Sequence, residues 1–270
     1  MRVSSLRPHH HGAIAAFGIM LGLVGVAVSQ TDPASASSSA DAQPLTGLIS
    51  QTGATLGGSG GVPALPVVAV TPESSGELIS ALQIRLNWVG SLSAPPSGTF
   101  GPETTAALKH FQEKQRLKKT GIADEKTVAK LVAVARNGFI DPRCSGPGIV
   151  LCVDKTAKLT RYMKDGVVVR SLDTNFGPEK GDAKFGQYSR TREGVNRIVS
   201  KEKLSVSSSY GYAMPYWMGF DGGIGFHFSK YFSQVGYKDT SMGCTTLRDE
   251  AGAKWLFANT PMGTKVVVYH

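Results

Sequence analysis

The residues best suited to chemistry in this 270-residue chain are a cysteine and a histidine in its C-terminal part. Cys244 lies within residues 240–249, and His227 lies a short way upstream. A free thiol has a pKa near ~8.5 and supplies little thiolate at neutral pH, so it needs a neighbouring base. An imidazole meets that need, and Gly243 permits a sharp turn that aims backbone N–H groups at an oxyanion. The pair therefore predicts acyl transfer through a cysteine nucleophile.

Two other interpretations of this pair are open. A zinc site needs at least three protein ligands, and this region offers one Cys and one His, so neither a metal nor a cofactor is predicted. An inert, buried Cys244 is the second alternative, because cysteine is among the most buried residue types. Among the six histidines only His227 is near Cys244 in the sequence; the others are His9, His10, His11, His110 and His270.

The segment from residue 225 to residue 249 resembles the active-site signature of the L,D-transpeptidases, in which a histidine precedes a Ser/Thr-His-Gly-Cys turn. The matching positions are His227, Ser241, Gly243 and Cys244. Met242 stands where the family has a second histidine, and Thr246 stands where it has Asn or Arg. The resemblance implies a cysteine acyltransferase that acts on peptidoglycan, and the two departures predict reduced activity.

The resemblance also implies the role of each catalytic group. Cys244 attacks a donor tetrapeptide stem at the carbonyl of its third residue, and D-alanine leaves. His227 acts first as base and then as acid, while backbone N–H groups around Gly243 hold the oxyanion. An acceptor amine then takes the acyl group and forms a crosslink between stems. Carbapenem-type inhibitors are implied as ligands of the same cysteine.

Three further residues are predicted to bind substrate: Ser241, Arg248 and Tyr216. Arg248 can hold a carboxylate with its planar fork, or it can pair with an acid of the protein as a structural clasp. Alternation along a strand lets at most one of Tyr216 and Trp217 reach the substrate.

Composition and the N-terminal residues favour an exported globular protein. Apolar residues make up 41% and charged residues 18%, which is ordinary for a folded chain. The net charge of +9 suits an anionic wall polymer or membrane surface, or serves solubility alone, and no nucleic-acid motif accompanies it. Arg2 and Arg7 precede an apolar run over residues 13–28, which is typical of a secretory signal. We therefore expect residues 1–29 to be a signal peptide or a membrane anchor, and the protein to reach the cell wall or the outside.

Export affects the interpretation of the three cysteines. An oxidising compartment favours disulfides, and three cysteines leave one over. Cys144 and Cys152 flank a Ser-Gly-Pro-Gly turn and are the natural pair, which makes Cys244 the spare thiol. The sequence permits the other two pairings as well, but each would place the candidate nucleophile in a bridge.

The first half of the chain is predicted to hold a linker and a helical unit. Residues 30–72 are rich in Ala, Ser, Gly and Pro and indicate a flexible linker. Within residues 73–138, Gly90 ends a first apolar helix, Pro102 begins a second, Gly121 ends it, and Asp124 caps a third. The unit resembles the peptidoglycan-binding domain 1 family, and the residues that match are Leu82-Gln83, Gly98-x-Phe100-Gly101, Thr104, Ala107, Phe111-Gln112, Gly121 and Asp124-x-x-Thr127.

The second half, residues 139–270, is predicted to be mostly β. Short β-branched and aromatic runs predict strands at 149–153, 159–163, 167–169, 171–175, 195–200, 214–220 and 266–269, with one helix at 250–257. Lys164-Asp165-Gly166 predicts a hairpin turn. The predicted fold is therefore a small three-helix bundle followed by a sandwich or barrel domain, and the resemblance to the L,D-transpeptidase catalytic domain covers this half.

Overall fold

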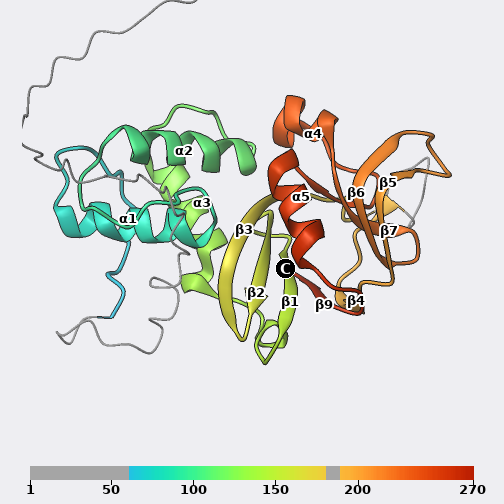
Figure 1. The fold of residues 1–270 in the computed structure, drawn as a ribbon. Helices are drawn as coiled ribbons and strands as arrows, with labels where there is room; N and C mark the ends of the chain where they lie inside the picture. Colours follow the sequence, from blue (N-terminus) through green and yellow to red (C-terminus); the bar gives the residue numbers. More distant parts are fainter. Residues whose placement is uncertain (1–60, 181–188) are drawn as a thin grey trace, which may run out of the picture. The chain divides into compact units, whose positions relative to one another are not determined.

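The structure, a computed structural model, describes residues 61–180 and 189–270. The predicted signal segment and most of the predicted linker lie outside these residues. A bundle of helices comes first, and a curled sheet with two further helices follows it (Figure 1). In these two ranges, no helix is long and apolar enough to cross a membrane.

The bundle consists of α1 (Gly76–Trp88), α2 (Pro102–Lys114) and α3 (Glu125–Ala135). The Ser75 side chain caps α1 by accepting from the Leu78 N–H, and Asp124 caps α3 by accepting from the Thr127 N–H. Helix α2 ends at Lys114, earlier than the predicted end at Gly121. Gln115 is the C-cap of the helix. The next residue, Arg116, has a positive φ of 56°, which is incompatible with a right-handed helix, so the helix ends there.

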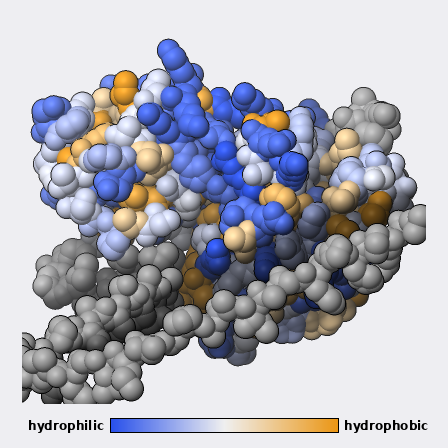
Figure 2. All heavy atoms as spheres, turned by 45° about the horizontal axis from the view of Figure 1, so that its top comes forward, coloured by the Kyte–Doolittle hydropathy of each residue, from blue (hydrophilic) through white to orange (hydrophobic). Residues whose placement is uncertain are grey.

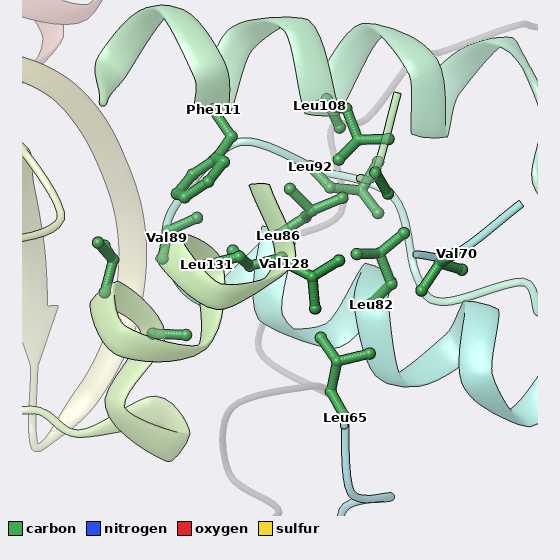
Figure 3. Packing of buried hydrophobic residues seen from close by; sticks show 14 of the residues in the cluster. Leu65, Val70, Leu82, Leu86, Val89, Leu92, Leu108, Phe111, Val128 and Leu131 are labelled. Atoms are coloured by element: carbon green, nitrogen blue, oxygen red, sulfur yellow. The ribbon is translucent and has the colours of Figure 1, made fainter. Parts of the chain in front are cut away.

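A single apolar core holds the bundle together (Figure 3). Leu82 and Leu86 of α1, Phe111 of α2 and Leu131 of α3 are all fully buried. Burial of each such side chain contributes about 1.5–3 kcal/mol of transfer free energy. The shared core explains why three short helices, each marginal alone, form a stable unit.

The end of the predicted linker belongs to this core, which corrects the boundary at residue 72. Leu65 and Val70 are buried in the same cluster. The Val70 N–H donates to the Ala123 carbonyl at 2.9 Å, so the segment pairs as a short bridge. The apolar residues of this segment recur at neither helical nor alternating spacing, so the sequence gave no indication that they would be buried.

The described residues after the bundle contain one sheet of nine strands, in the order β4-β9-β1-β2-β3-β8-β7-β6-β5. Its strands are β1 (Ile149–Asp154), β2 (Leu159–Lys164), β3 (Val167–Asn175), β4 (Gly194–Arg197), β5 (Ser200–Val206), β6 (Ala213–Asp221), β7 (Ile224–Phe228), β8 (Thr245–Leu247) and β9 (Lys265–Tyr269). The helices are α4 (Lys230–Val235) and α5 (Glu250–Asn259), and the 3-10 turns are η2 (Arg136–Gly138), η3 (Pro142–Cys144) and η5 (Gly236–Lys238). The mostly-β fold class is confirmed, with a curled sheet as its form.

Several strands differ from their predicted extents. The two runs predicted at 167–169 and 171–175 form one continuous strand, β3. The run predicted at 195–200 is divided between β4 and β5, with a break at residues 198 and 199. The hairpin between β2 and β3 has the predicted turn, because Asp165 and Gly166 both have positive φ.

Candidate active site

His227 and Cys244 are positioned by two neighbouring parallel strands at the centre of one half of the sheet. His227 lies on β7 and is paired in register with Thr246 of β8, two residues after Cys244. The chain connects the two strands through α4 and η5 and returns to β8 through the turn that carries the cysteine. The two residues are therefore neighbours in space because β7 and β8 are parallel.

The ring of His227 is held in one tautomer. Its Nδ1 lies 2.8 Å from the Phe228 carbonyl oxygen, which can only accept, so Nδ1 carries the proton. The other nitrogen, Nε2, is buried and has no hydrogen-bond partner among the residues that the structure describes. Burial lowers the pKa of His227, and the Phe228 carbonyl only partly opposes this. The ring is therefore neutral at pH 7, with a free lone pair on Nε2.

Cys244 is the free thiol of the chain. Cys144 and Cys152 are joined by a disulfide, with their Cα atoms 5.8 Å apart, and both are buried. Cys244 is 7% exposed. Burial raises the pKa of its thiol, and the backbone N–H of Gly225 partly offsets that rise. The resting pair is therefore a neutral thiol beside a neutral imidazole, and the proton must move during the attack.

The turn before Cys244 is held in place by the buried hydroxyl of Thr191. Thr191 donates to the Gly243 carbonyl at 2.7 Å and accepts from the Gly177 N–H at 3.0 Å. Gly243 has a φ of +105°, a conformation that favours glycine. A Cβ on Gly177 would lie 2.7 Å from the Gly243 Cα, so a glycine is required there by close approach. Because C=O and N–H point oppositely across a trans peptide, the Cys244 N–H points away from Thr191.

Ser241 and Asn175 shape the same turn. The Ser241 N–H donates to the Phe176 carbonyl at 2.8 Å, and its hydroxyl donates to the Cys244 carbonyl. The Asn175 amide donates to the Asp239 carbonyl at 2.9 Å, which ties the preceding loop to β3. The contacts of Ser241 are thus with the backbone of the turn, and its predicted contact with substrate stays a prediction.

Aromatic side chains border the two candidate catalytic residues. Trp217 packs in one buried cluster with Met214 and Cys244, and its ring centroid lies 6.2 Å from that of His227. The Tyr212 ring lies 6.3 Å from His227. Burial, and then the negative charge that Cys244 gains at high pH, raise the pKa of Tyr212 to about 12, so it stays a phenol at neutral pH. Trp217 therefore packs beside the thiol, while Tyr212, whose side chain is exposed, lies beside His227.

The structure does not bring Tyr216 to this group. Its ring packs against Phe257 of α5, with centroids 6.1 Å apart, on the other face of β6. Alternation along β6 therefore presents Trp217 to Cys244, and Tyr216 is the member of the pair that points away.

Arg248 and Met242 also have definite surroundings. Arg248 donates to Glu113 of α2 at 2.7 Å, so the clasp is the alternative that its contacts favour. Met242 is 44% exposed beside the turn, so it is free of the packing that would fix its type.

Sequence reasoning did not single out four of the residues that shape this site. Gly177, Asn175 and Tyr212 lie in no recognised motif. The fourth is Thr191, whose contact with Gly243 no local pattern of the sequence indicates. Each acts through a contact far away in the chain, such as the 52-residue separation between Thr191 and Gly243.

Comparison with known protein families gives two matches within the chain. Residues 75–131 match the model of the peptidoglycan binding domain, and residues 148–268 match the model of the L,D-transpeptidase catalytic domain. The chain therefore carries a peptidoglycan-binding domain followed by an L,D-transpeptidase catalytic domain, and the resemblance stated from the sequence is confirmed. A comparison with curated proteins found no match.

Similar solved structures include L,D-transpeptidases of actinobacteria. One from Xylanimonas cellulosilytica is 27% identical, with a TM-score of 0.46 over 77% of this chain and 100% of that one. One from Stackebrandtia nassauensis is 24% identical, with a TM-score of 0.49 over 77% of this chain and 98% of that one. L,D-transpeptidase 3 from Mycobacterium tuberculosis, with a faropenem-derived adduct, is 20% identical, with a TM-score of 0.37 over 46% of this chain and 61% of that one.

Proposed function

We propose that this protein is an exported peptidoglycan L,D-transpeptidase that uses Cys244 as its nucleophile. The observation that carries the proposal is the state of His227. Its Nδ1 is committed to the Phe228 carbonyl, while its buried Nε2 has no partner in the described part of the chain. A buried lone pair without a partner costs free energy, so it supports a functional role. The free thiol on the adjacent strand is the group that this base would serve.

The reaction proceeds in two halves. The Cys244 sulfur bonds to the carbonyl carbon of the third stem residue as its proton passes to His227 Nε2. The Cys244 N–H, aimed by the Thr191 contact with Gly243, stabilises the oxyanion. The bond to D-alanine breaks as His227 returns the proton to the leaving amine, which leaves a thioester. An acceptor amine attacks the thioester, its proton passes to His227, and the sulfur leaves and regains a proton.

Acylation of the intact protein tests this proposal. Incubation of the full chain with a tetrapeptide stem, or with a carbapenem, should give one covalent adduct by intact-mass spectrometry. Cys244→Ala should give none. An unmodified wild-type protein after hours, in a sample whose circular dichroism shows it folded, would instead favour a non-catalytic wall-binding protein that keeps both domains.

The pKa shifts predict how the thiol responds to pH. Because burial raises the pKa of Cys244 and lowers that of His227, neither group is charged near pH 7. Alkylation of Cys244 by iodoacetamide should therefore rise with pH, by about tenfold per unit between pH 7 and 9, as the thiolate fraction grows. A rate that is flat across this range would show a preformed ion pair and contradict the neutral resting state.

The remaining parts of the proposal concern the wall. Residues 73–138 would hold the enzyme on peptidoglycan, and residues 139–270 would carry the chemistry. Export would depend on residues 1–29, as a signal peptide or an anchor. Cell fractionation with antibody detection tests that step, since a cytoplasmic protein would have no access to mature stems.

A further inference from the structure

A cleft lies between the end of α2 and the segment formed by α4 and η5. It has a volume of about 620 Å³. One wall belongs to the region that matches the peptidoglycan-binding domain, and the other to the region that matches the catalytic domain. We call it the α2–α4 cleft; its charged lining residues are Glu113, Arg116, Lys119, Lys238 and Arg248.

The two walls are fixed to each other by buried polar contacts. Lys114 of α2 is fully buried and donates to Asp173 of β3 at 3.0 Å, and Arg248 donates to Glu113 of α2 at 2.7 Å. Arg116 donates through Nε to the Tyr237 carbonyl of η5 at 2.7 Å. Breaking a buried ion pair leaves an uncompensated charge, so such contacts hold their elements in place.

The charge of the cleft is strongly positive. Four cationic side chains surround one carboxylate, that of Glu113, which leaves a net charge of +3 among the lining residues. Burial acts to raise the pKa of Glu113, but its contacts with Lys119 and Arg248 outweigh this and lower it. This internal carboxylate already bridges two cations, at 3.0 Å from Lys119 and 2.7 Å from Arg248.

Cationic groups beyond this bridge remain for a ligand. Arg116 commits only Nε, and its two terminal nitrogens have no contact within residues 61–180 and 189–270 that would occupy them. Lys238 is exposed at the rim. Figure 2 shows hydrophilic residues across much of the face that it presents, with only small apolar patches between them. A planar guanidinium beside an ammonium suits carboxylates.

We infer that the α2–α4 cleft binds the free carboxylates of peptidoglycan stem peptides, at a site separate from Cys244. The inference rests on the proposed function for the identity of the polymer. Arg248 and Cys244 stand at opposite ends of β8, about 13 Å apart for four extended residues. A stem peptide held in the cleft would therefore be a neighbour of the stem that reacts at Cys244. Binding in the cleft would in this way hold the wall close to the reaction site.

The test uses the full chain and purified sacculi whose phosphate-containing polymers have been removed. The double variant Lys119→Glu/Lys238→Glu should bind these sacculi about tenfold more weakly at 0.15 M salt, where long-range attraction is screened over ~8 Å. The matched control, Lys126→Glu/Lys130→Glu, has the same charge change at exposed positions of α3 and should bind normally. Charge removal by Lys119→Gln/Lys238→Gln should give a smaller loss in the same direction.

Two comparisons make the outcome decisive. On glycan whose stem peptides have been removed by an amidase, the cleft variant should bind like wild type, and an equal loss there would overturn the carboxylate assignment. An effect that appears only on sacculi that retain phosphate polymers would also overturn it. Acylation of Cys244 by a free tetrapeptide is measured in parallel. If the wild type forms no adduct, the proposed function is contradicted. If the wild type forms the adduct but the cleft variant binds sacculi as well as the wild type does, only the proposal for the cleft is contradicted.

Discussion

Gln112 in the helical bundle and His227 beside the cysteine turn are both buried polar side chains, but their hydrogen bonding differs. In the bundle, the amide of Gln112 donates to the Ile122 carbonyl at 2.9 Å and to the Thr127 hydroxyl at 3.2 Å, and its oxygen accepts from the Gly121 N–H. At the turn, His227 uses one nitrogen and leaves the other buried without a partner in the described residues.

The difference bears on what each of these two side chains does. A buried polar group left without a partner costs about 1–3 kcal/mol. Arg85 Nε and Ser91 Oγ of the bundle are also buried without a partner in the described residues, so the cost alone does not mark a site. His227 differs from them because the free thiol of Cys244 lies directly before the adjacent strand, β8. Gln112, although it belongs to the motif that resembles a peptidoglycan-binding family, is satisfied by its own turn and stabilises the bundle. Gln112 thus supports the fold of that unit, while His227 keeps a buried nitrogen available beside a free thiol.

The largest expected effect is that of removing His227, the base with the unpartnered nitrogen. His227→Ala should slow acylation of Cys244 by about a thousandfold, equivalent to about 4 kcal/mol, because the thiol then has no internal proton acceptor. The rate is measured by intact mass over time with a saturating acyl donor. The control is His270→Ala, because His270 is exposed and follows the end of β9; this variant should react at the wild-type rate. Equal rates for both variants would remove His227 from the mechanism.

A second, smaller effect concerns the hydroxyl that aims the turn. Thr191→Val keeps the shape but removes both contacts with Gly243 and Gly177, and should slow acylation by about a hundredfold, as loss of an oxyanion donor does. Thr191→Ser should restore most of the rate. Alkylation of Cys244 by iodoacetamide forms no oxyanion, so it should stay within about twofold. If alkylation falls in parallel, Thr191 supports folding of the turn only.

The structural role of Gln112 in the bundle is tested by measuring the free energy of unfolding. Gln112→Leu leaves the Gly121 N–H, the Ile122 carbonyl and their neighbours without partners, and should lower the free energy of unfolding by about 2 kcal/mol. Urea denaturation followed by circular dichroism measures this. Gln234→Leu, on the exposed face of α4, should change it by less than ~0.5 kcal/mol. Acylation per folded molecule should be unchanged in both.

The sequence predicted those parts of the molecule whose signals are local. The helix cap at Asp124, the hairpin at Asp165 and the run of β1 are all set by residues close together in the chain. The short strand β8 and the helix α4 were not predicted, because three and six residues carry too little period to recognise. The partners of the cysteine turn, such as Thr191, come from strands that only the sheet order brings together.

The smallest effect is expected from the residue that departs from the family pattern. Met242 is 44% exposed and cannot exchange protons, so Met242→His adds a solvated imidazole beside Cys244 without disturbing a packed core. Acylation should rise by about tenfold or less, because an exposed group acts through water and its field is weak. The gain should fade below pH ~6.5, where an ordinary imidazole becomes protonated. Met242→Gln, which adds polarity without a titrating group, should give no gain. A gain of a hundredfold or more would mean that the base at His227 is not sufficient, and that the buried lone pair is not the main proton acceptor of the site.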